Sequence, residues 1–370
     1  MRILVVTQHF WPENFRINDI VEGFVQDGLS VDVLCGLPNY PKGEWFDGYS
    51  ADGPFEEVYK GARVFRAREI PRKGNTGKTI FLNYVSWPLY AAGALKRLPG
   101  GYDAVFCFNT SPVQMCWPAI KYAKKHGVHV HAWINPYRVS YDKTEKVTES
   151  MLKTDSGIYY DPSSANVQRL IINGIREIID NYEVYGIHLD DYFYPTDIGD
   201  ADKDSYIEYK KNGGTLETDA WRRSNVNNLI KEIYRTLKEK DENLIFSVSP
   251  GADIKKDYIS YYADVYAWCG NKGYCDWIIP QIYFGFKNSS MPFTKTLDSW
   301  EALIKNDSVK LIPGLPAYKI GKEDAYAGEG KTEFIDGGKD VIKKQIKEVN
   351  SRKSCAGYSV YSYSYIKDIQ

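Results

Sequence analysis

The sequence predicts an α/β protein whose strands are mostly parallel. Short runs of apolar, β-branched and aromatic residues alternate along the chain with longer segments in which apolar residues recur every three or four positions. This alternation is typical of strands joined by crossover helices, which places the strands in parallel. With 370 residues, the chain is long enough for one large domain or two ordinary ones.

Ten segments are expected to be strands because they are short, apolar and separated by turn residues or helical patterns. In chain order they are residues 3–6, 31–35, 62–67, 104–109, 128–134, 185–190, 244–249, 277–284, 309–315 and 357–365. The helical pattern is clearest in SANVQRLIINGIREIIDNY (164–182) and SNVNNLIKEIYRTLKEKD (224–241). The polar stretches 47–60, 141–157 and 196–218 are expected to be long loops.

Composition and residue spacing argue against nucleic-acid binding, a membrane span and a metal or cofactor. The 47 Lys and Arg residues are spread along the chain and balanced by 48 Asp and Glu, so no nucleic-acid footprint is expected. The N-terminus lacks the apolar core of a signal peptide and no later run reaches membrane-spanning length, so we expect a cytoplasmic protein without a membrane span. Six cysteines show no CxxC pair and no metal-ligand spacing, which predicts free thiols and neither metal nor cofactor.

Residues 1–125 resemble the N-terminal half of a family-4-like bacterial glycosyltransferase. The resemblance rests on MRILVVTQHFWPENFRINDIVEGFVQDGLSVDVLCGLPNYPKGEWFDGY and on YDAVFCFNTSPVQMCWPAI. It implies a Rossmann-like half-domain that faces the acceptor, without the second domain that holds the nucleotide-sugar. The residues it offers as acceptor contacts, or alternatively as loop and cap hydrogen bonds, are Asn14, Arg16, Asn18, Asn39 and Tyr40.

Residues 126–370 resemble the glycosyl hydrolase-like 10 family, barrel proteins linked to bacterial cell-wall glycans. Six motifs occur in the order of the family: HAWINPYRVS, GIHLDDYFYP, FSVSPGA, DWIIPQIYFG, GLPAYKIG and YSVYSYSYI. They correspond to strands three to eight of a (β/α)8 TIM-type barrel, and the first two strand units are missing. The resemblance therefore implies an incomplete barrel, fused to the Rossmann-like half at about residue 125.

We expect the two halves to form one continuous, twisted sheet that does not close. Residues 104–109 are expected beside 128–134, since that order suits both families. For residues 3–6 we expect 31–35 as the neighbour rather than 357–365, because local pairing needs less loop closure.

The adjacent carboxylates Asp190 and Asp191 in GIHLDDYFYP are the predicted catalytic residues. Cleavage of a glycosidic bond usually needs two carboxyl groups, and the end of a barrel strand is where barrel enzymes keep their chemistry. Strand alternation sends the two side chains in opposite directions, so they cannot share one role. Tyr192, Tyr194 and Trp133 could raise one carboxyl pKa by desolvation. The alternative is that the pair caps a helix or holds a loop.

Further polar residues follow the neighbouring strands and are predicted to bind substrate. These candidates are Asn135, Tyr137, Arg138, Tyr192, Gln281, Tyr283, Tyr318 and Lys319. The alternative for Arg138 is a salt bridge to Asp190 or Asp191. A second catalytic carboxylate could also come from Asp253, Glu323 or Asp324. His188 is expected to be a hydrogen-bonded core histidine rather than a metal ligand.

The sequence thus favours a glycoside hydrolase-like protein that acts on a polysaccharide or glycan strand of the bacterial cell wall or surface. One alternative is a glycosyltransferase-related protein that binds acceptor but cannot transfer. The other is a sugar-binding fusion without catalysis. A wall hydrolase would need export, whereas the chain as written is expected in the cytoplasm.

Overall fold

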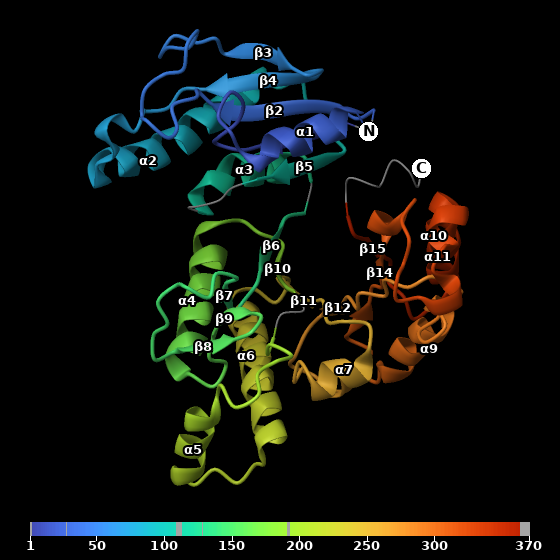
Figure 1. Ribbon diagram of the computed structural model, residues 1–370. Helices are drawn as coiled ribbons and strands as arrows, with labels where there is room; N and C mark the ends of the chain where they lie inside the picture. The colour runs from blue at the N-terminus through green and yellow to red at the C-terminus, as the bar shows by residue number, and fades with distance from the viewer. Residues whose placement is uncertain (1, 27, 109–112, 128, 191–192, 363–370) are drawn as a thin grey trace. The chain divides into compact units, whose positions relative to one another are not determined.

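The computed structural model describes residues 2–26, 28–108, 113–127, 129–190 and 193–362 (Figure 1). The chain divides into two compact units, unit 1 (Met1–Val130) and unit 2 (His131–Gln370). Each has a hydrophobic core of its own. Among the described residues, no helix is both long enough and apolar enough to cross a membrane.

Unit 1 contains a five-stranded sheet in the order β3-β4-β2-β1-β5. Its strands are β1 (Arg2–Val6), β2 (Ser30–Gly36), β3 (Glu56–Tyr59), β4 (Ala62–Ala67) and β5 (Ala104–Cys107). All neighbours are parallel except β3, which pairs antiparallel with β4. Residues 3–6 of β1 are fully buried. This continuous apolar run is expected where both faces of a parallel sheet are covered.

Three helices accompany the sheet of unit 1: α1 (Arg16–Gln26), α2 (Gly77–Ala94) and α3 (Trp117–Lys125). Short 3₁₀ turns lie at Lys73–Asn75, Leu95–Arg97 and Val113–Cys116. Helix α2 begins with a capping box in which Thr76 accepts from the Thr79 backbone and the Thr79 side chain accepts from Thr76. The Trp87 and Ala91 side chains of α2 are fully buried in the core of unit 1.

Unit 2 is built on a parallel sheet in the order β13-β12-β11-β10-β6. The strands are β6 (His131–Ile134), β10 (Gly186–Leu189), β11 (Ile245–Val248), β12 (Trp277–Ile278) and β13 (Lys310–Leu311). Two more strands, β14 (Gly314–Leu315) and β15 (Ser359–Val360), form a parallel pair. Each strand of this sheet lies beside the strand of the same sheet that comes next in the sequence. This is the order found in a (β/α) barrel.

Helices connect the strands of unit 2. They are α4 (Ala165–Asn181), α5 (Lys203–Lys211), α6 (Thr218–Lys240), α7 (Ile254–Ile259), α8 (Val265–Gly270), α9 (Phe293–Leu303), α10 (Glu333–Asp336) and α11 (Gly338–Ser351). The hydroxyl of Ser164 caps α4 by accepting from the Val167 backbone. Helices α4 and α6, which precede and follow β10, pack side by side (Figure 1). The two segments with the clearest helical pattern in the sequence are therefore helices.

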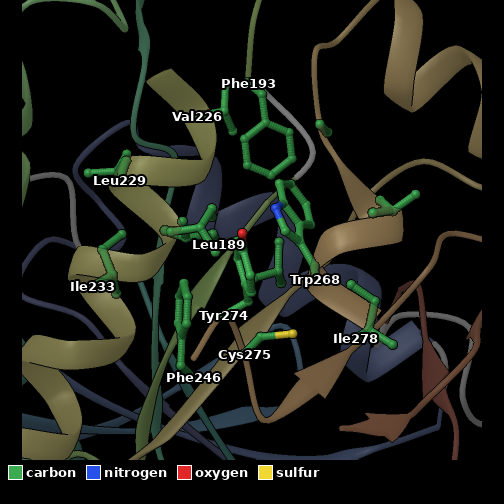
Figure 2. Close-up of a cluster of buried hydrophobic side chains, with 14 of the residues drawn as sticks. Leu189, Phe193, Val226, Leu229, Ile233, Phe246, Trp268, Tyr274, Cys275 and Ile278 are labelled. Atoms are coloured by element: carbon green, nitrogen blue, oxygen red, sulfur yellow. The ribbon is translucent and has the colours of Figure 1, made fainter. Parts of the chain in front are cut away.

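The core of unit 2 lies between the sheet and these helices. Leu189, Val248, Ile278 and Leu311 occupy matching positions on four adjacent strands, and all are fully buried. Figure 2 shows residues of α6, among them Leu229, gathered with the strand residues of this cluster. Burying one such side chain stabilises the fold by about 1.5–3 kcal/mol relative to exposure.

The structure confirms part of the predicted strand pairing and corrects the rest. Residues 3–6 pair with 31–35, as predicted. Residues 104–107 pair with β1, so the expectation that 104–109 lies beside 128–134 is wrong. The expected single continuous sheet is also wrong, since the described strands of the two units belong to separate sheets. Within 357–365, Ser359–Val360 pairs with β14.

The three predicted long loops contain regular structure. Strand β3 lies in 47–60 and helix α5 lies in 196–218. Segment 141–157 contributes to an antiparallel sheet of β7 (Arg138–Ser140), β8 (Met151–Thr154) and β9 (Gly157–Tyr160), in the order β7-β9-β8. The strands in 277–284 and 309–315 are shorter than predicted because Pro280 and Pro313 interrupt them, since proline has no backbone N–H to donate.

Candidate functional site

A cavity of about 720 Å³ lies on the face of the unit 2 sheet opposite the helices. Because side chains alternate along a strand, every second residue of each strand faces this cavity while its neighbours face the core. The side chains that line it from β6 to β12 are His131, Trp133, His188, Asp190, Ser247, Ser249, Trp277, Ile279, Gln281 and Tyr283. Residues 356–361 line its other side.

The strand register places several of these residues in one row. Trp133 is opposite His188, His188 is opposite Ser247, and Ser247 is opposite Trp277. Asp190 lies two residues beyond His188, immediately after β10. The cavity therefore has a floor of aromatic and polar groups, with a carboxylate at the carboxyl end of a central strand. In barrel enzymes the chemistry occurs at this end of the strands.

His188 is a neutral, hydrogen-bonded group in the floor. Its Nδ1 lies 2.8 Å from the hydroxyl of Ser247. Burial lowers the pKa of His188 from 6.5 to about 4; His131 also lowers it, whereas the nearby Asp190 raises it. At neutral pH the imidazole is thus uncharged and can accept or donate one hydrogen bond at each nitrogen according to its tautomer.

Asp190 is held by a residue from another strand end. The amide Nε2 of Gln281 donates to Oδ1 of Asp190 at 3.3 Å. The backbone N–H of Asp190 donates to Ile134 O, which continues the ladder between β10 and β6 one residue beyond the strand. These contacts fix a carboxylate that lines the cavity, and Gln281 constrains the direction in which it points.

Aromatic rings stand on two sides of the cavity. Tyr283, Tyr318 and Tyr361 form a cluster with ring centroids 5.7–5.9 Å apart, and Tyr283 is stacked against Tyr361. On the other side, the Trp133 ring packs edge-on against His188 at 5.7 Å and is 62% exposed. Exposed aromatic faces beside polar groups suit contact with the apolar face of a sugar ring.

The predicted binding residues after the later strands take different positions. Gln281 and Tyr283 line the cavity with Asp190. Tyr318 supports the Tyr283 ring through the cluster described above. The Lys319 ammonium forms an ion pair with Asp324 at 2.6 Å and donates to the Tyr283 carbonyl at 2.8 Å. Lys319 therefore has a structural contact within this loop.

The predicted residues after β6 do not line the cavity. Asn135 accepts from the Arg138 backbone at 3.3 Å. Tyr137 is fully buried in the core of unit 2, which leaves it no accessible surface. The Arg138 guanidinium donates to the Tyr141 hydroxyl and lies 4.6 Å from the centroid of that ring. Asp191 and Tyr192, also predicted for the site, lie outside the described residues.

The three other candidates for a second carboxylate have structural contacts elsewhere. Asp253 caps α7 by accepting from the backbones of Lys255 and Lys256. Asp324 is the buried partner of Lys319. Glu323 lies 3.8 Å from the Lys331 ammonium on the surface. None of the three lines the cavity.

Sequence reasoning missed much of the cavity floor. The sequence motifs do not single out His131, Ser247, Ser249 and Trp277, and His188, predicted to be a core residue, faces the cavity. A usable signal was present in the strands HAWI, GIHL and IFSV, where a polar or aromatic residue alternates with an apolar one. Matching this alternation across the strands predicts which residues share a face.

In unit 1, the residues offered as acceptor contacts divide into two kinds. Asn18 accepts from the Trp11 backbone and donates to the Glu13 carbonyl, and Asn39 donates to the buried Glu69 carboxylate. Both side chains are buried, and their hydrogen bonds hold the loops of unit 1. Asn14, Arg16 and Tyr40 are exposed.

No cluster of three or more His, Cys, Asp or Glu side chains suited to a metal ion occurs in the described parts of the chain. All six cysteines are free thiols, and Cys35, Cys269 and Cys275 are buried. Burial raises the pKa of Cys35 and of Cys269 to about 12, so neither is a thiolate at neutral pH.

Comparison with known proteins identifies relatives of the C-terminal part. A family model described as glycosyl hydrolase-like 10 matches residues 117–328. Over 265 residues the chain is 30% identical to glycosyl hydrolase YngK of Bacillus subtilis (strain 168), covering 64% of this chain and 49% of YngK. Over 282 residues it is 28% identical to glycosyl hydrolase DigH of Escherichia coli (strain K12), covering 67% of this chain and 63% of DigH. The chain thus spans about half to two thirds of the length of these relatives.

A solved structure shares the fold at low sequence identity. The PgaB (BpsB) glycoside hydrolase domain from Bordetella bronchiseptica aligns with a TM-score of 0.50 and 13% identity, covering 99% of this chain and 95% of that domain. This likeness is one of fold alone. It agrees with the barrel-like order of the strands in unit 2.

Proposed function

The chain belongs to the glycosyl hydrolase-like 10 family, whose model matches more than half of it, and on this premise we propose that unit 2 cleaves a glycan of the bacterial cell wall or surface. The observation that carries the proposal is the position of Asp190. Its carboxylate lines a cavity large enough for sugar rings, at the carboxyl end of a central strand, and is oriented by Gln281.

In the proposed mechanism Asp190 acts on the glycosidic bond. A carboxyl group at this place can protonate the leaving oxygen or stabilise the positive charge that develops on the sugar ring. The neutral imidazole of His188 offers a hydrogen bond to a sugar hydroxyl without adding a competing positive charge. Asp191, which follows directly in the chain, is the second carboxylate of the proposal.

The aromatic rings provide the surface on which the glycan would lie. Trp133 and Tyr361 both line the cavity, and 62% and 46% of their surfaces are exposed. Stacking on rings at two sides of Asp190 would hold successive sugar units and place the bond between them near the carboxylate. The glycan class is proposed from the family and the cavity together.

Binding of the glycan without cleavage is a second candidate function. One specific observation favours it: Asp253, Glu323 and Asp324 all have structural contacts away from the cavity. Without a second carboxylate that faces the cavity, Asp190 would lack the partner that hydrolysis usually requires. The aromatic and polar lining would then act as a sugar-binding site.

For unit 1 we propose the role suggested by its glycosyltransferase-like motifs, acceptor binding without transfer. The support is the sequence resemblance and a mostly parallel sheet in the order β3-β4-β2-β1-β5. We also propose a cytoplasmic location, which would restrict unit 2 to glycans that are present inside the cell, because cleavage of the finished wall requires export. Fractionation of cells that express the chain, followed by immunoblotting, tests the location.

The decisive experiment compares wild-type protein with Asp190→Asn on purified peptidoglycan glycan strands. New reducing ends are measured together with oligosaccharide binding by calorimetry. Asp190→Asn keeps the shape of the side chain but removes its charge and proton, so we expect at least a roughly hundredfold loss of cleavage with binding retained. Asp180→Asn, an equivalent change on the exposed surface of α4, is the matched control.

Each outcome has a defined meaning for the proposal. Unchanged cleavage by Asp190→Asn would remove this residue from the mechanism, and Asp191→Asn would then test its neighbour. Binding without cleavage by the wild-type protein would select the second candidate function. Absence of both activities on wall and surface glycans would contradict the glycan proposal altogether.

A further inference from the structure

Helix α2 of unit 1 carries a stripe of exposed apolar side chains. Phe81, Val85 and Leu89 are spaced four residues apart and therefore lie on one side of the helix. Phe81, Val85 and Leu89 are 65%, 42% and 59% exposed. We call these three residues the α2 stripe.

The stripe is not the core-facing side of the helix. That side is formed by Trp87, Ala91 and Ala94, which are buried against the sheet of unit 1. A surface helix normally pairs one apolar face with a polar one. Helix α2 is apolar on both faces. A continuous exposed apolar surface of this kind usually marks an interaction site.

The segment that carries the stripe has charged residues of one sign only. Residues 70–102 contain no Asp or Glu, although 48 such residues in a chain of 370 would give about four in a segment of this length. Lys73 and Lys78 lie before the stripe and Lys96 after it, and all three are exposed. Lys78 precedes Phe81 by three residues, so it lies on the same side of the helix. Cations therefore border the stripe at both ends.

We propose that the α2 stripe inserts into the interface of an anionic phospholipid bilayer. Its apolar side chains would enter the boundary between headgroups and acyl chains, and the lysines at its two ends would meet lipid phosphates. Helix α2 would then lie in the plane of the membrane. The stripe belongs to unit 1, whereas the cavity belongs to unit 2.

Charge argues against a second copy of the chain as the occupant. In a twofold contact between two antiparallel α2 stripes, Lys78 of one copy would approach Lys96 of the other, and like charges at close range are unfavourable. A lipid surface instead supplies the negative charge that residues 70–102 lack. The carboxylate-free segment thus favours the bilayer.

Flotation of the full chain with lipid vesicles tests this proposal. Vesicles of phosphatidylcholine with about 30% phosphatidylglycerol are compared with phosphatidylcholine alone, at low and at physiological salt. We expect the wild-type chain to float with the anionic vesicles. Phe81→Gln/Leu89→Gln, which introduces good helix formers, should lower the partition coefficient at least tenfold. Val58→Gln, at a 69% exposed apolar residue of β3, should leave it unchanged.

The lysines give an independent readout that does not alter apolar contacts. Lys78→Gln/Lys96→Gln should lower binding to anionic vesicles several-fold and abolish the preference over neutral ones. Circular dichroism checks that every variant is folded. Failure of the wild-type chain to float, or equal flotation of the Phe81→Gln/Leu89→Gln variant, would overturn the proposal. So would a dimer in light scattering that the same two substitutions dissociate, because the stripe would then bind a second copy.

Discussion

The neutral state of His188 has a measurable effect on stability. Burial lowers the pKa of this imidazole from 6.5 to about 4. The unfolded chain therefore binds a proton at pH values where the folded chain does not, and stability must fall as the pH is lowered through this range. The contribution of His188 is fully present above pH 6.5 and is lost progressively as the pH falls toward about 4.

The size of the effect follows from the two pKa values. Between about pH 7.5 and pH 5, the difference in proton binding removes about 2 kcal/mol from the free energy of unfolding. His188→Asn keeps a polar atom near the Ser247 hydroxyl but cannot titrate. Over the same pH interval, we therefore expect its free energy of unfolding to fall by about 2 kcal/mol less than that of the wild-type protein. Asp190 lies close enough to act on the charge of the imidazole, so it is left unchanged in both proteins.

Urea unfolding followed by circular dichroism at both pH values provides the measurement. Ser247→Ala is the matched control, because it removes the hydrogen-bond partner of His188 but leaves the titrating ring in place. This variant should keep most of the wild-type pH dependence. Equal pH dependence in the wild-type protein and in His188→Asn would refute the conclusion that the ring is held neutral by burial.

Further predictions concern the core and the ligands. Arg222→Met should destabilise unit 2 by about 3–5 kcal/mol, because it leaves the buried Asp202 carboxylate without the guanidinium that lies 2.6 Å away. Urea unfolding measures this loss, and a value below about 1 kcal/mol would contradict the prediction. Leu189→Ala should cost about 2–5 kcal/mol in the same assay, whereas Leu170→Ala on the exposed side of α4 should change stability by less than about 1 kcal/mol. Calorimetric titration with nucleotide-sugars should show no binding, since no glycine-rich phosphate loop follows β1; micromolar affinity would instead favour a glycosyltransferase-related role.

The strands of this protein could be predicted where apolar runs are long or strictly alternating. Each of the ten expected segments contains a strand. The small antiparallel sheet was missed because β8 and β9 are only four residues each and are joined by the two residues Asp155 and Ser156. Such a hairpin leaves little periodicity in the sequence, although a glycine at position 157, with positive φ, is a usable turn signal.

Only those site residues that directly follow a strand could be predicted from the sequence. Asp190 and Gln281 are 91 residues apart, yet both follow strands, and the structure brings them into contact. The ion pair of Lys319 with Asp324 depends instead on the irregular path of one loop, which no periodic pattern encodes. The buried position of Tyr137 likewise depends on tertiary packing, because tyrosine is equally suited to a core and to a binding surface.

The two-residue alternation of β10 determines where this protein can tolerate insertions and deletions. Ile187 and Leu189 belong to the core, whereas His188 and Asp190 line the cavity. One residue added or removed between Gly186 and Asp190 would exchange the two sets, placing an imidazole and a carboxylate against the helices and two aliphatic chains in the cavity. This reversal of side-chain directions would thus abolish both folding and catalysis. Homologous chains should therefore keep the length of this strand constant even where its residues vary, and alignment gaps should fall in the connections on either side.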